Sequence, residues 1–335
     1  MNYVCLMKFA QRLGVMLILT GICGTALAQQ RQDVPARIAL KDTAGAIDVL
    51  LTGRRGQIIH ARLGENAPGT ITYDAGDIRR MLITLPQDAI RQAESSAAAG
   101  NTSEAVRRMR AVIQPVIPYL DLPVEGVVDQ AFRYAEFLRR ERSWAAAISV
   151  YRALNGNPDA TVRQQATGWL AYCHVRNQEN KEAQDILSTL QVEDPRHAGF
   201  IPANVAGAWL KLTANDEEGA LDLAARATSL ARIDHELYPE SVFVSAMAYA
   251  RFSDKLSEKP SQKEVVLRRS GDEEAPMPAV TADECRDVAI RQFTRLVELF
   301  PSSPFSADAT KQLETLQKND ESTPTTPLNE SGATP

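Results

Sequence analysis

Four kinds of local signature are missing from this 335-residue sequence. It has no His-Glu-x-x-His, no Gly-x-Ser-x-Gly, no Cys-x-x-Cys and no glycine pattern of a dinucleotide-binding loop. Those patterns bring together, at close spacing, the metal ligands, nucleophiles or backbone amides that metal-dependent, nucleophilic or nucleotide-dependent catalysis needs. The four histidines, His60, His174, His197 and His235, are scattered along the chain. The sequence therefore predicts no enzyme, no cofactor-binding residues and no metal site.

An apolar run near the amino terminus is short. Lys8 and Arg12 precede the run Leu13–Thr25, and Ala26-Leu27-Ala28 supplies small residues at both positions that a signal peptidase requires. A permanent bilayer anchor needs about 20 apolar residues. We therefore expect residues 1–28 to be a secretory signal peptide and the mature chain to begin at Gln29. The expected location is the periplasm, or alternatively outside the cell, with no integral membrane anchor after cleavage.

Basic charge is scarce as well. The sequence has 37 basic and 42 acidic residues; residues 1–28 hold two of the basic ones and no acid, which leaves 35 against 42 in the mature chain. Nucleic acid and anionic lipid both require a concentrated basic surface. The mildly acidic balance therefore argues against either of them as the main partner.

Residues 36–86 contain five short runs of strand-forming residues separated by turn residues. These runs are Arg37–Leu40, Ala46–Leu51, Gln57–Leu63, Thr70–Tyr73 and Arg80–Leu85. Alternating runs joined by glycine-containing turns predict antiparallel hairpins, and Gly53–Gly56 is such a turn. Five strands in this length, with a helical turn at Asp77-Ile78-Arg79 before the last, resemble the small SH3-like or Sm-like barrels. We expect a small antiparallel β-barrel here.

A helical pattern recurs between Gln87 and Lys318. The stretch Thr161–Pro195 predicts two antiparallel helices, each with one apolar face. A small residue early in the second helix, followed by an aliphatic one, recurs along the chain. The clearest occurrences are Ala105-Val106, Ala147-Ile148, Ala220-Leu221 and Ala289-Ile290. One hairpin cannot bury its apolar faces alone, so several are expected to stack.

Two stretches carry a family resemblance. Trp144 to Ile148 with Tyr151 and Leu154 resembles the tetratricopeptide repeat (TPR), as does Ala289-Ile290 with Phe293, Leu296 and Pro301. Leu299 to Pro304 is also similar to the repeats of exported bacterial envelope proteins. The resemblance implies antiparallel helix pairs of about 34 residues, and we expect about five TPR-like units in residues 87–318. The expected fold class is therefore mainly α, an α-α helical-repeat solenoid preceded by the small barrel.

One unit is expected to be split. The repeating alanines Ala220 and Ala289 lie too far apart for one ordinary unit, yet residues 254–281 are rich in proline and charge and show no helical period. We expect a first helix at Pro239–Phe252, a flexible insertion at 254–281 and a second helix at Ala282–Phe300.

The last helix, expected at Phe305–Leu316, would cap the apolar end of the stack. Residues 319–335 are expected to be a disordered tail because of their Ser, Thr, Pro and Gly content. Cys173 and Cys285 fall in units that are not neighbours, so two separately packed thiols are expected. His174 falls where the repeat buries a side chain, which favours packing over catalysis.

The TPR resemblance also implies where a partner would bind. In that family the first helix of each pair lines a concave groove, and the residues beside the buried stripe point into it. Aromatic and arginine side chains are typical of protein-binding surfaces. In this sequence the groove positions are Phe132, Glu136, Arg139, Arg140, Tyr172, Arg176, Trp209, Leu212, Phe243, Met247 and Arg251. The alternative for Tyr172, Trp209 and Met247 is that they pack between adjacent repeats.

These expectations together predict an exported, non-enzymatic scaffold or adaptor that holds a protein or peptide in the concave groove. One alternative is a structural subunit of an envelope-assembly complex. Another is a carbohydrate-binding accessory protein that acts through the barrel with Arg54, Arg55 and Tyr73.

Overall fold

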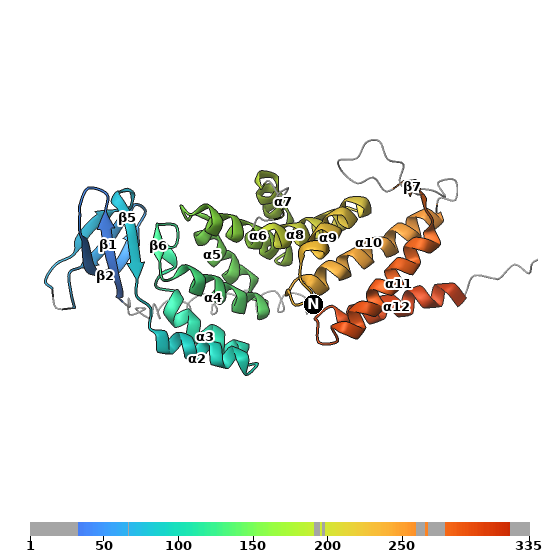
Figure 1. Cartoon of the computed structure of the whole chain (residues 1–335), viewed down its shortest axis with the longest axis horizontal. Coiled ribbons are helices and arrows are strands. Elements are labelled where there is room, and N and C mark those ends of the chain that lie inside the picture. Colours follow the sequence, from blue (N-terminus) through green and yellow to red (C-terminus); the bar gives the residue numbers. More distant parts are fainter. Residues whose placement is uncertain are drawn as a thin grey trace, which may run out of the picture.

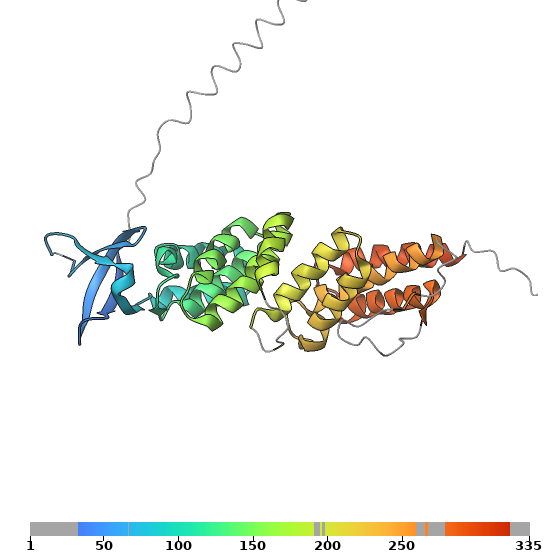
Figure 2. The ribbon, with the colours of Figure 1, turned by 90° about the horizontal axis from the view of Figure 1, so that it is seen from above.

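The computed structural model describes residues 33–65, 67–190, 195, 198–258, 265–266 and 279–321. The expected signal peptide, most of the insertion and the tail beyond residue 321 lie outside the described residues. The molecule is elongated, with a β-sheet at one end and a row of helices that leads to the last helix, α12 (Ser306–Glu321), at the other (Figures 1 and 2).

The sheet is open. Its strands follow the order β4-β3-β2-β1-β5-β6, and all neighbours are antiparallel except the parallel pair β5 and β6. The strands are β1 (Val34–Leu40), β2 (Ala46–Arg55), β3 (Ile58–Arg62), β4 (Ile71–Asp74), β5 (Ile78–Ile83) and β6 (Val124–Glu125). The predicted closed barrel is therefore wrong. Strand β5 takes β6 as its second neighbour, so it is not available to close the sheet against β4.

Alternation along the strands decides which face of the sheet is buried. In β1, Val34, Ala36 and Ile38 are buried while Pro35 and Arg37 are exposed, as expected for a strand with one face in water. The buried face belongs to the same hydrophobic cluster as the first helices. The β2–β3 hairpin turns at Gly56, whose φ of 56° is a left-handed value that favours glycine. A 3₁₀ turn at Ala75–Asp77 precedes β5.

The helices of the described residues form five antiparallel pairs and a terminal helix. The pairs are α2 (Gln87–Ala98) with α3 (Thr102–Ile113), α4 (Val128–Arg140) with α5 (Trp144–Asn155), α6 (Ala160–Arg176) with α7 (Asn180–Thr189), α8 (Phe200–Thr213) with α9 (Glu217–Leu230), and α10 (Tyr238–Glu258) with α11 (Ala282–Leu299). The repeating alanines Ala105, Ala147, Ala183, Ala220 and Ala289 are each 0% exposed. The prediction of a mainly helical repeat after an N-terminal strand-rich segment is therefore confirmed.

Two glycines allow a close approach within the array. Gly168 in α6 lies against Gly199, the residue before α8, and a Cβ built on Gly168 would lie 2.2 Å from the Gly199 carbonyl oxygen. Helix α7 is short and buries only Ala183 of its own residues. Helix α6 therefore packs directly against α8 as well as against α7.

The last pair has long helices joined through the insertion. Helix α10 continues to Glu258, beyond the predicted end at Phe252, so residues 254–258 of the predicted insertion are helical. Val265–Val266 pairs with Ala279–Val280 as a two-stranded ribbon, labelled β7 and β8. Thr281 and Glu284 then form a capping box that begins α11. None of the described helices contains a stretch long and apolar enough to cross a membrane.

Candidate functional site

The eleven predicted groove residues lie on the first helices of the second to fifth pairs. Helix α4 carries Phe132, Glu136, Arg139 and Arg140, α6 carries Tyr172 and Arg176, α8 carries Trp209 and Leu212, and α10 carries Phe243, Met247 and Arg251. The structure brings Arg139, Tyr172, Arg176, Trp209 and Phe243 into one cluster with two acidic residues, Glu236 and Glu240. We call this set the concave cluster, after the predicted groove. It also includes the aromatic residues that contact the two arginines, namely Trp144, Tyr151, Trp169 and Phe305.

Arg139 is the buried cation of the concave cluster. Its Nη1 and Nη2 atoms donate to the two carboxylate oxygens of Glu236, both at 2.9 Å, and its Nε donates to the Tyr151 hydroxyl at 2.9 Å. The guanidinium carbon lies 3.5 Å from the centroid of the Trp169 ring. Bidentate pairing and stacking on an aromatic face both compensate a desolvated guanidinium. Because Glu236 is 97 residues further along the chain, this contact joins the second helix pair to the fifth.

Glu240 is the buried acid of the cluster. It lies in the first turn of α10 and is 2% exposed. Its carboxylate accepts hydrogen bonds from the Tyr172 hydroxyl at 2.5 Å, from Trp209 Nε1 at 2.6 Å and from Arg176 Nη1 at 3.4 Å. Burial raises the pKa of Glu240, and the Arg176 charge opposes that shift. Burial, followed by the Glu240 charge, also raises the pKa of Tyr172.

Arg176 is only partly buried, with 28% of its side chain exposed. Its guanidinium carbon lies 5.8 Å from the Trp144 ring centroid, 5.7 Å from that of Trp209 and 5.5 Å from that of Phe305. These rings come from α5, α8 and the residue that precedes the terminal helix. The buried Nε atom of Arg176 has no hydrogen-bond partner among the described residues. Arg176 is thus a partly desolvated cation with an unused donor.

The remaining predicted residues lie beside the cluster. Phe243 contacts Trp209, with ring centroids 6.1 Å apart, and Phe132 contacts Tyr151 at 6.1 Å. Leu212 is buried, and its carbonyl oxygen accepts a hydrogen bond from Arg251 Nη1 at 2.7 Å.

Two more predicted residues pair with each other. Glu136 and Arg140 form an ion pair at 2.5 Å along α4, away from the Arg176 aromatic residues. Met247 is half-buried and packs against the hydrophobic cores of the last two helix pairs. The structure therefore brings together five of the eleven predicted residues, Arg139, Tyr172, Arg176, Trp209 and Phe243, and leaves the other six outside the cluster.

Sequence reasoning missed the acids and several of the rings. Glu236, Glu240, Trp169 and Phe305 join the cluster although none belongs to the predicted groove. The only local signal for Glu240 is its place in the first turn of a helix, where acidic residues are generally favoured. That preference does not reveal which residues of distant helices it faces.

Other chemical groups are accounted for by packing. His174 is 3% exposed, and its Nδ1 lies 2.5 Å from a Glu179 carboxylate oxygen. Cys173 and Cys285 are buried free thiols, and burial raises their pKa values to about 12 and about 11. Neither thiol is activated as a nucleophile, because activation requires a lowered pKa. In the described ranges no three potential metal ligands come together.

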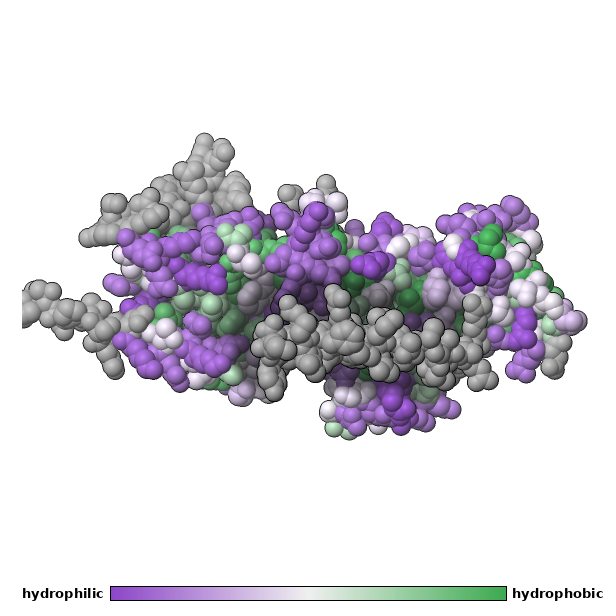
Figure 3. All heavy atoms as spheres, turned by 180° about the vertical axis from the view of Figure 1, so that it is seen from behind, coloured by the Kyte–Doolittle hydropathy of each residue, from purple (hydrophilic) through white to green (hydrophobic). Residues whose placement is uncertain are grey.

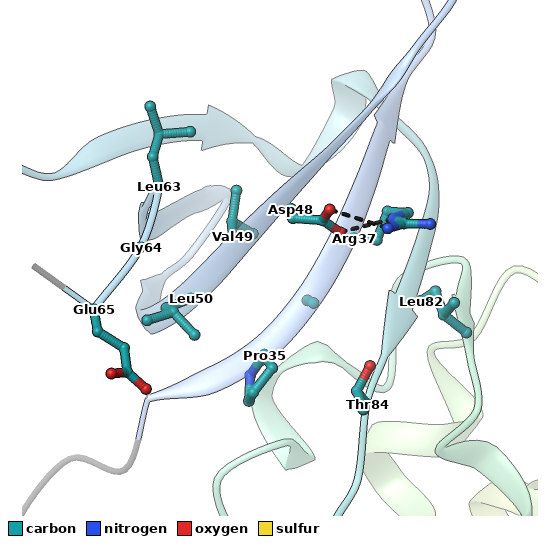
Figure 4. A pocket seen from close by; sticks show the side chains of 11 residues that line it. Pro35, Arg37, Asp48, Val49, Leu50, Leu63, Gly64, Glu65, Leu82 and Thr84 are labelled. Carbon is teal, nitrogen blue, oxygen red and sulfur yellow. Dashed lines mark hydrogen bonds and ion pairs between the residues drawn. The ribbon is translucent and has the colours of Figure 1, made fainter. Parts of the chain in front are cut away.

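The exposed face of the sheet carries a shallow pocket of about 490 Å³ (Figure 4). Leu50 and Leu63 lie on one side of it and Leu82 on the other. The Arg37–Asp48 ion pair, with Nε and Oδ1 2.7 Å apart, lies between them. Seen from behind, the molecule is mainly hydrophilic with separate hydrophobic patches, one of them at the sheet end (Figure 3).

Arg54, Arg55 and Tyr73 do not converge on that face. Arg54 pairs with Ile59 and Arg55 with Ile58 in the β2–β3 register, so the two arginines point to opposite faces of the sheet. Tyr73 is opposite Ile59 in β4, on the buried side.

The stacked hairpins, each with a buried alanine early in its second helix, define a helical-repeat protein with a TPR-like fold. No family model matches the sequence, and no curated protein matches it. Among solved structures the chain is similar to a monomeric mutant of IFIT1 solved with m7Gppp-AAAA, at 15% identity and a TM-score of 0.48 over 71% of this chain. It spans 48%, about half, of that IFIT1 chain. A TPR repeats protein from Bacteroides fragilis is 12% identical with a TM-score of 0.29, covering 69% of this chain and 98% of that one.

Proposed function

We propose that this protein is an exported, non-enzymatic scaffold that binds a protein partner through the concave cluster. The observation that supports this proposal is the environment of Arg176. Its guanidinium is partly exposed and is surrounded by the rings of Trp144, Trp209 and Phe305. Tryptophan and arginine in a largely desolvated setting are the residues that most often dominate binding energy in protein interfaces. Export rests on the small-residue cleavage site that follows the apolar amino-terminal run.

A partner would use two kinds of contact at this site. A carboxylate would accept hydrogen bonds from the free side of the Arg176 guanidinium, and an apolar side chain beside it would cover the rings of Trp144 and Phe305. Glu240 already holds Arg176, Trp209 and Tyr172 in place. The site is therefore pre-organised, which lowers the entropy lost on binding.

A capture experiment with the mature chain tests this proposal. Wild type and Arg176→Gln are immobilised and exposed to an envelope extract, with Arg232→Gln as the matched control because the Arg232 side chain is exposed and pairs with Asp234, not with a residue of the cluster. A partner bound by wild type and Arg232→Gln should bind Arg176→Gln about 30-fold more weakly, the effect expected for a hot-spot residue. Circular dichroism checks that helicity is unchanged. Equal capture by folded Arg176→Gln would contradict the proposal.

The second candidate, a structural subunit of an envelope complex, is favoured by the sheet. Of the eight large hydrophobic residues exposed in the described part of the chain, five lie in the sheet segment: Ile47, Ile58, Leu63, Ile71 and Leu82. A subunit docked through the pocket on the exposed face of the sheet, which Leu63 and Leu82 line, would lose its complex in Leu63→Ser/Leu82→Ser and keep it in Arg176→Gln. The scaffold proposal expects the opposite result.

A further inference from the structure

A cleft of about 970 Å³ lies between the sheet and the first two helix pairs. Residues of β1 and β2, among them Leu51 and Arg54, form one wall. The other wall comes from α3, α4, α5 and the loop between α3 and α4, which contains a 3₁₀ turn at Ile117–Tyr119. The volume is at the upper end of the range for ligand sites, about 300–1,000 Å³. The cleft is separate from the charged centre of the concave cluster. Arg139, Arg176, Glu236 and Glu240 are not among the residues that line the cleft.

Every charged side chain that lines the cleft is an arginine. These are Arg54 from β2 and Arg107 and Arg110 from α3. Among the residues that the structure describes, no acid lines the cleft, although acids outnumber bases in the whole sequence by 42 to 37. The local charge therefore selects an anionic ligand.

The three arginines differ in how far they are already occupied. Arg54 is held by the Gly56 and Pro118 carbonyl oxygens, at 2.7 and 2.6 Å, and by the Asp121 carboxylate. Arg107 pairs with Glu104 at 2.7 Å. Arg110 contacts only the Tyr134 hydroxyl, at 3.4 Å, and has no carboxylate partner in the part of the chain that the structure describes. Its guanidinium has donors available for a ligand.

We infer that this cleft binds an acidic, extended segment of a partner protein, in which one carboxylate pairs with Arg110 and a second, two positions along, pairs with Nη1 of Arg107, the atom that the Glu104 pair through Nε and Nη2 does not use. The two arginines are three residues apart on α3, so their Cβ atoms lie about 5–6 Å from each other on one face of the helix. Alternate side chains of an extended segment point the same way at about 6.7 Å. The intervening side chains then face the sheet wall, which Thr52 and Gly53 line.

The lining also distinguishes a peptide from a phosphate-rich polymer. Two of the three arginines are already paired with a carboxylate, and much of the rest of the lining is apolar. A polyphosphate or nucleic acid would bring several closely spaced charges to a site with one unpaired cation. An acidic segment of polypeptide brings fewer charges together with apolar side chains. This site is separate from the concave cluster and does not depend on the proposed function.

Fluorescence anisotropy on the mature chain tests the inference. The probe is a labelled nine-residue peptide, Glu-Val-Glu-Ser-Glu-Val-Glu-Ser-Glu. The comparison peptides have the same composition with all glutamates adjacent, or lysine in place of glutamate. We expect the alternating peptide to bind best, the lysine peptide not to bind, and affinity to fall as salt is raised because the ion pairs are exposed.

The variants assign the binding to the cleft. Arg107→Gln/Arg110→Gln should weaken the alternating peptide about tenfold or more, because charge-assisted hydrogen bonds are lost. Arg91→Gln/Arg232→Gln removes the same charge from exposed arginines outside the cleft and should bind like wild type, as should Arg176→Gln. All four substituted arginines of the two double variants are exposed, so the fold should be retained.

Three results would overturn the inference. They are the absence of binding by wild type, equal binding by Arg107→Gln/Arg110→Gln, and tighter binding of inorganic polyphosphate that depends on Arg110. A loss of partner capture in Arg176→Gln with unchanged peptide binding concerns the proposed function alone.

Discussion

At the scale of single residues, the Arg139–Glu236 pair is unequally buried. The Arg139 side chain is 6% exposed, whereas that of Glu236 is 36% exposed. Removing Glu236 would leave a buried guanidinium without its counter-charge, but removing Arg139 would leave a carboxylate that water can solvate. The two partners of one ion pair are therefore expected to differ in their effect on stability.

The first prediction follows from this inequality. We expect Glu236→Ala to lower the free energy of unfolding by about 3 kcal/mol, as found when a buried ion pair loses one partner. Arg139→Met should lower it by only about 1–2 kcal/mol, mainly because the Tyr151 hydroxyl loses its hydrogen bond. Urea unfolding of both variants measures the difference. A larger loss for Arg139→Met would show that its contacts with Tyr151 and Trp169 outweigh the ion pair.

The buried carboxyl of Glu240 makes stability depend on pH. Burial raises its pKa in the folded protein above the ordinary value of 4.5, so the folded state holds this proton more tightly than the unfolded state. The stabilisation that results is complete below the unfolded pKa and is lost as the pH rises through the folded pKa. Glu240→Gln keeps the size of the side chain and removes the titration.

We therefore expect the unfolding free energy of wild type minus that of Glu240→Gln to fall as the pH rises from about 4, and then to level off above the folded pKa. Urea unfolding at a series of pH values between about 4 and 8 measures this difference. A difference that instead rises with pH would mean that the donors Tyr172, Arg176 and Trp209 favour the carboxylate by more than burial disfavours it.

At the scale of helices, the close approach of α6 to the start of α8 leaves no space for a side chain at Gly168. A Cβ there would lie 2.2 Å from the Gly199 carbonyl oxygen and 2.7 Å from its Cα, both backbone atoms. In α8, a Cβ on Gly207 would lie 3.0 Å from Leu223 Cδ1, the end of a flexible side chain, and at an ordinary contact distance of 3.9 Å from Leu187 Cδ1. The two helical glycines thus form a matched pair with different surroundings.

We expect Gly168→Ala to lower the free energy of unfolding by about 3 kcal/mol or more, because two backbones must separate. Gly207→Ala should stay within about 1 kcal/mol of wild type, since the better helix propensity of alanine offsets a small shift of Leu223. Thermal or urea unfolding compares them. Similar losses for both variants would show that α6 and α8 can separate at little cost.

The helices and strands also show what the sequence can and cannot predict. Strand and helix positions follow from local periodicity, so the β2–β3 hairpin and the alanine at the start of each second helix are found correctly. Closure of the sheet is not a local property. The neighbour of β5 is a two-residue strand, Val124–Glu125, inside a segment that contains Pro118 and Pro123. No alternation pattern can reveal a strand of that length.

The candidate site is predictable to a similar extent. The repeat register identifies Arg139, Tyr172, Arg176 and Trp209 as residues of one side of the array, and the structure brings them together. Their burial depends on how tightly the array curves, because curvature decides whether the start of α10 reaches α4. Curvature comes from many small packing angles between helix pairs. The sequence therefore indicates which residues share a face but not that Glu236 and Glu240 occupy it.

At the scale of the whole molecule, the array departs from the behaviour of a simple solenoid. In such proteins each repeat contacts only its neighbours, and stability is approximately a sum of repeat and nearest-neighbour contributions. Here Arg139 in the second pair contacts Glu236 immediately before the fifth, passing over two pairs. Phe305, which precedes the terminal helix, likewise reaches Arg176 in the third pair. These contacts should make distant helices unfold together.

Native-state hydrogen exchange measures this coupling, because amides that open in the same event share one free energy of exchange. In wild type we expect the slowest amides of α4 and α10 to share that value. In Glu236→Ala the link is absent, so α10 and α11 should open at lower free energy while α2 and α3 keep their wild-type protection. Arg232→Ala, which removes an exposed ion pair with Asp234 beside the same helix, should change neither group. If α2 and α3 lose as much protection as α10 in Glu236→Ala, the array unfolds as one unit for reasons other than this link, and the nearest-neighbour contacts alone are strong enough to couple its ends.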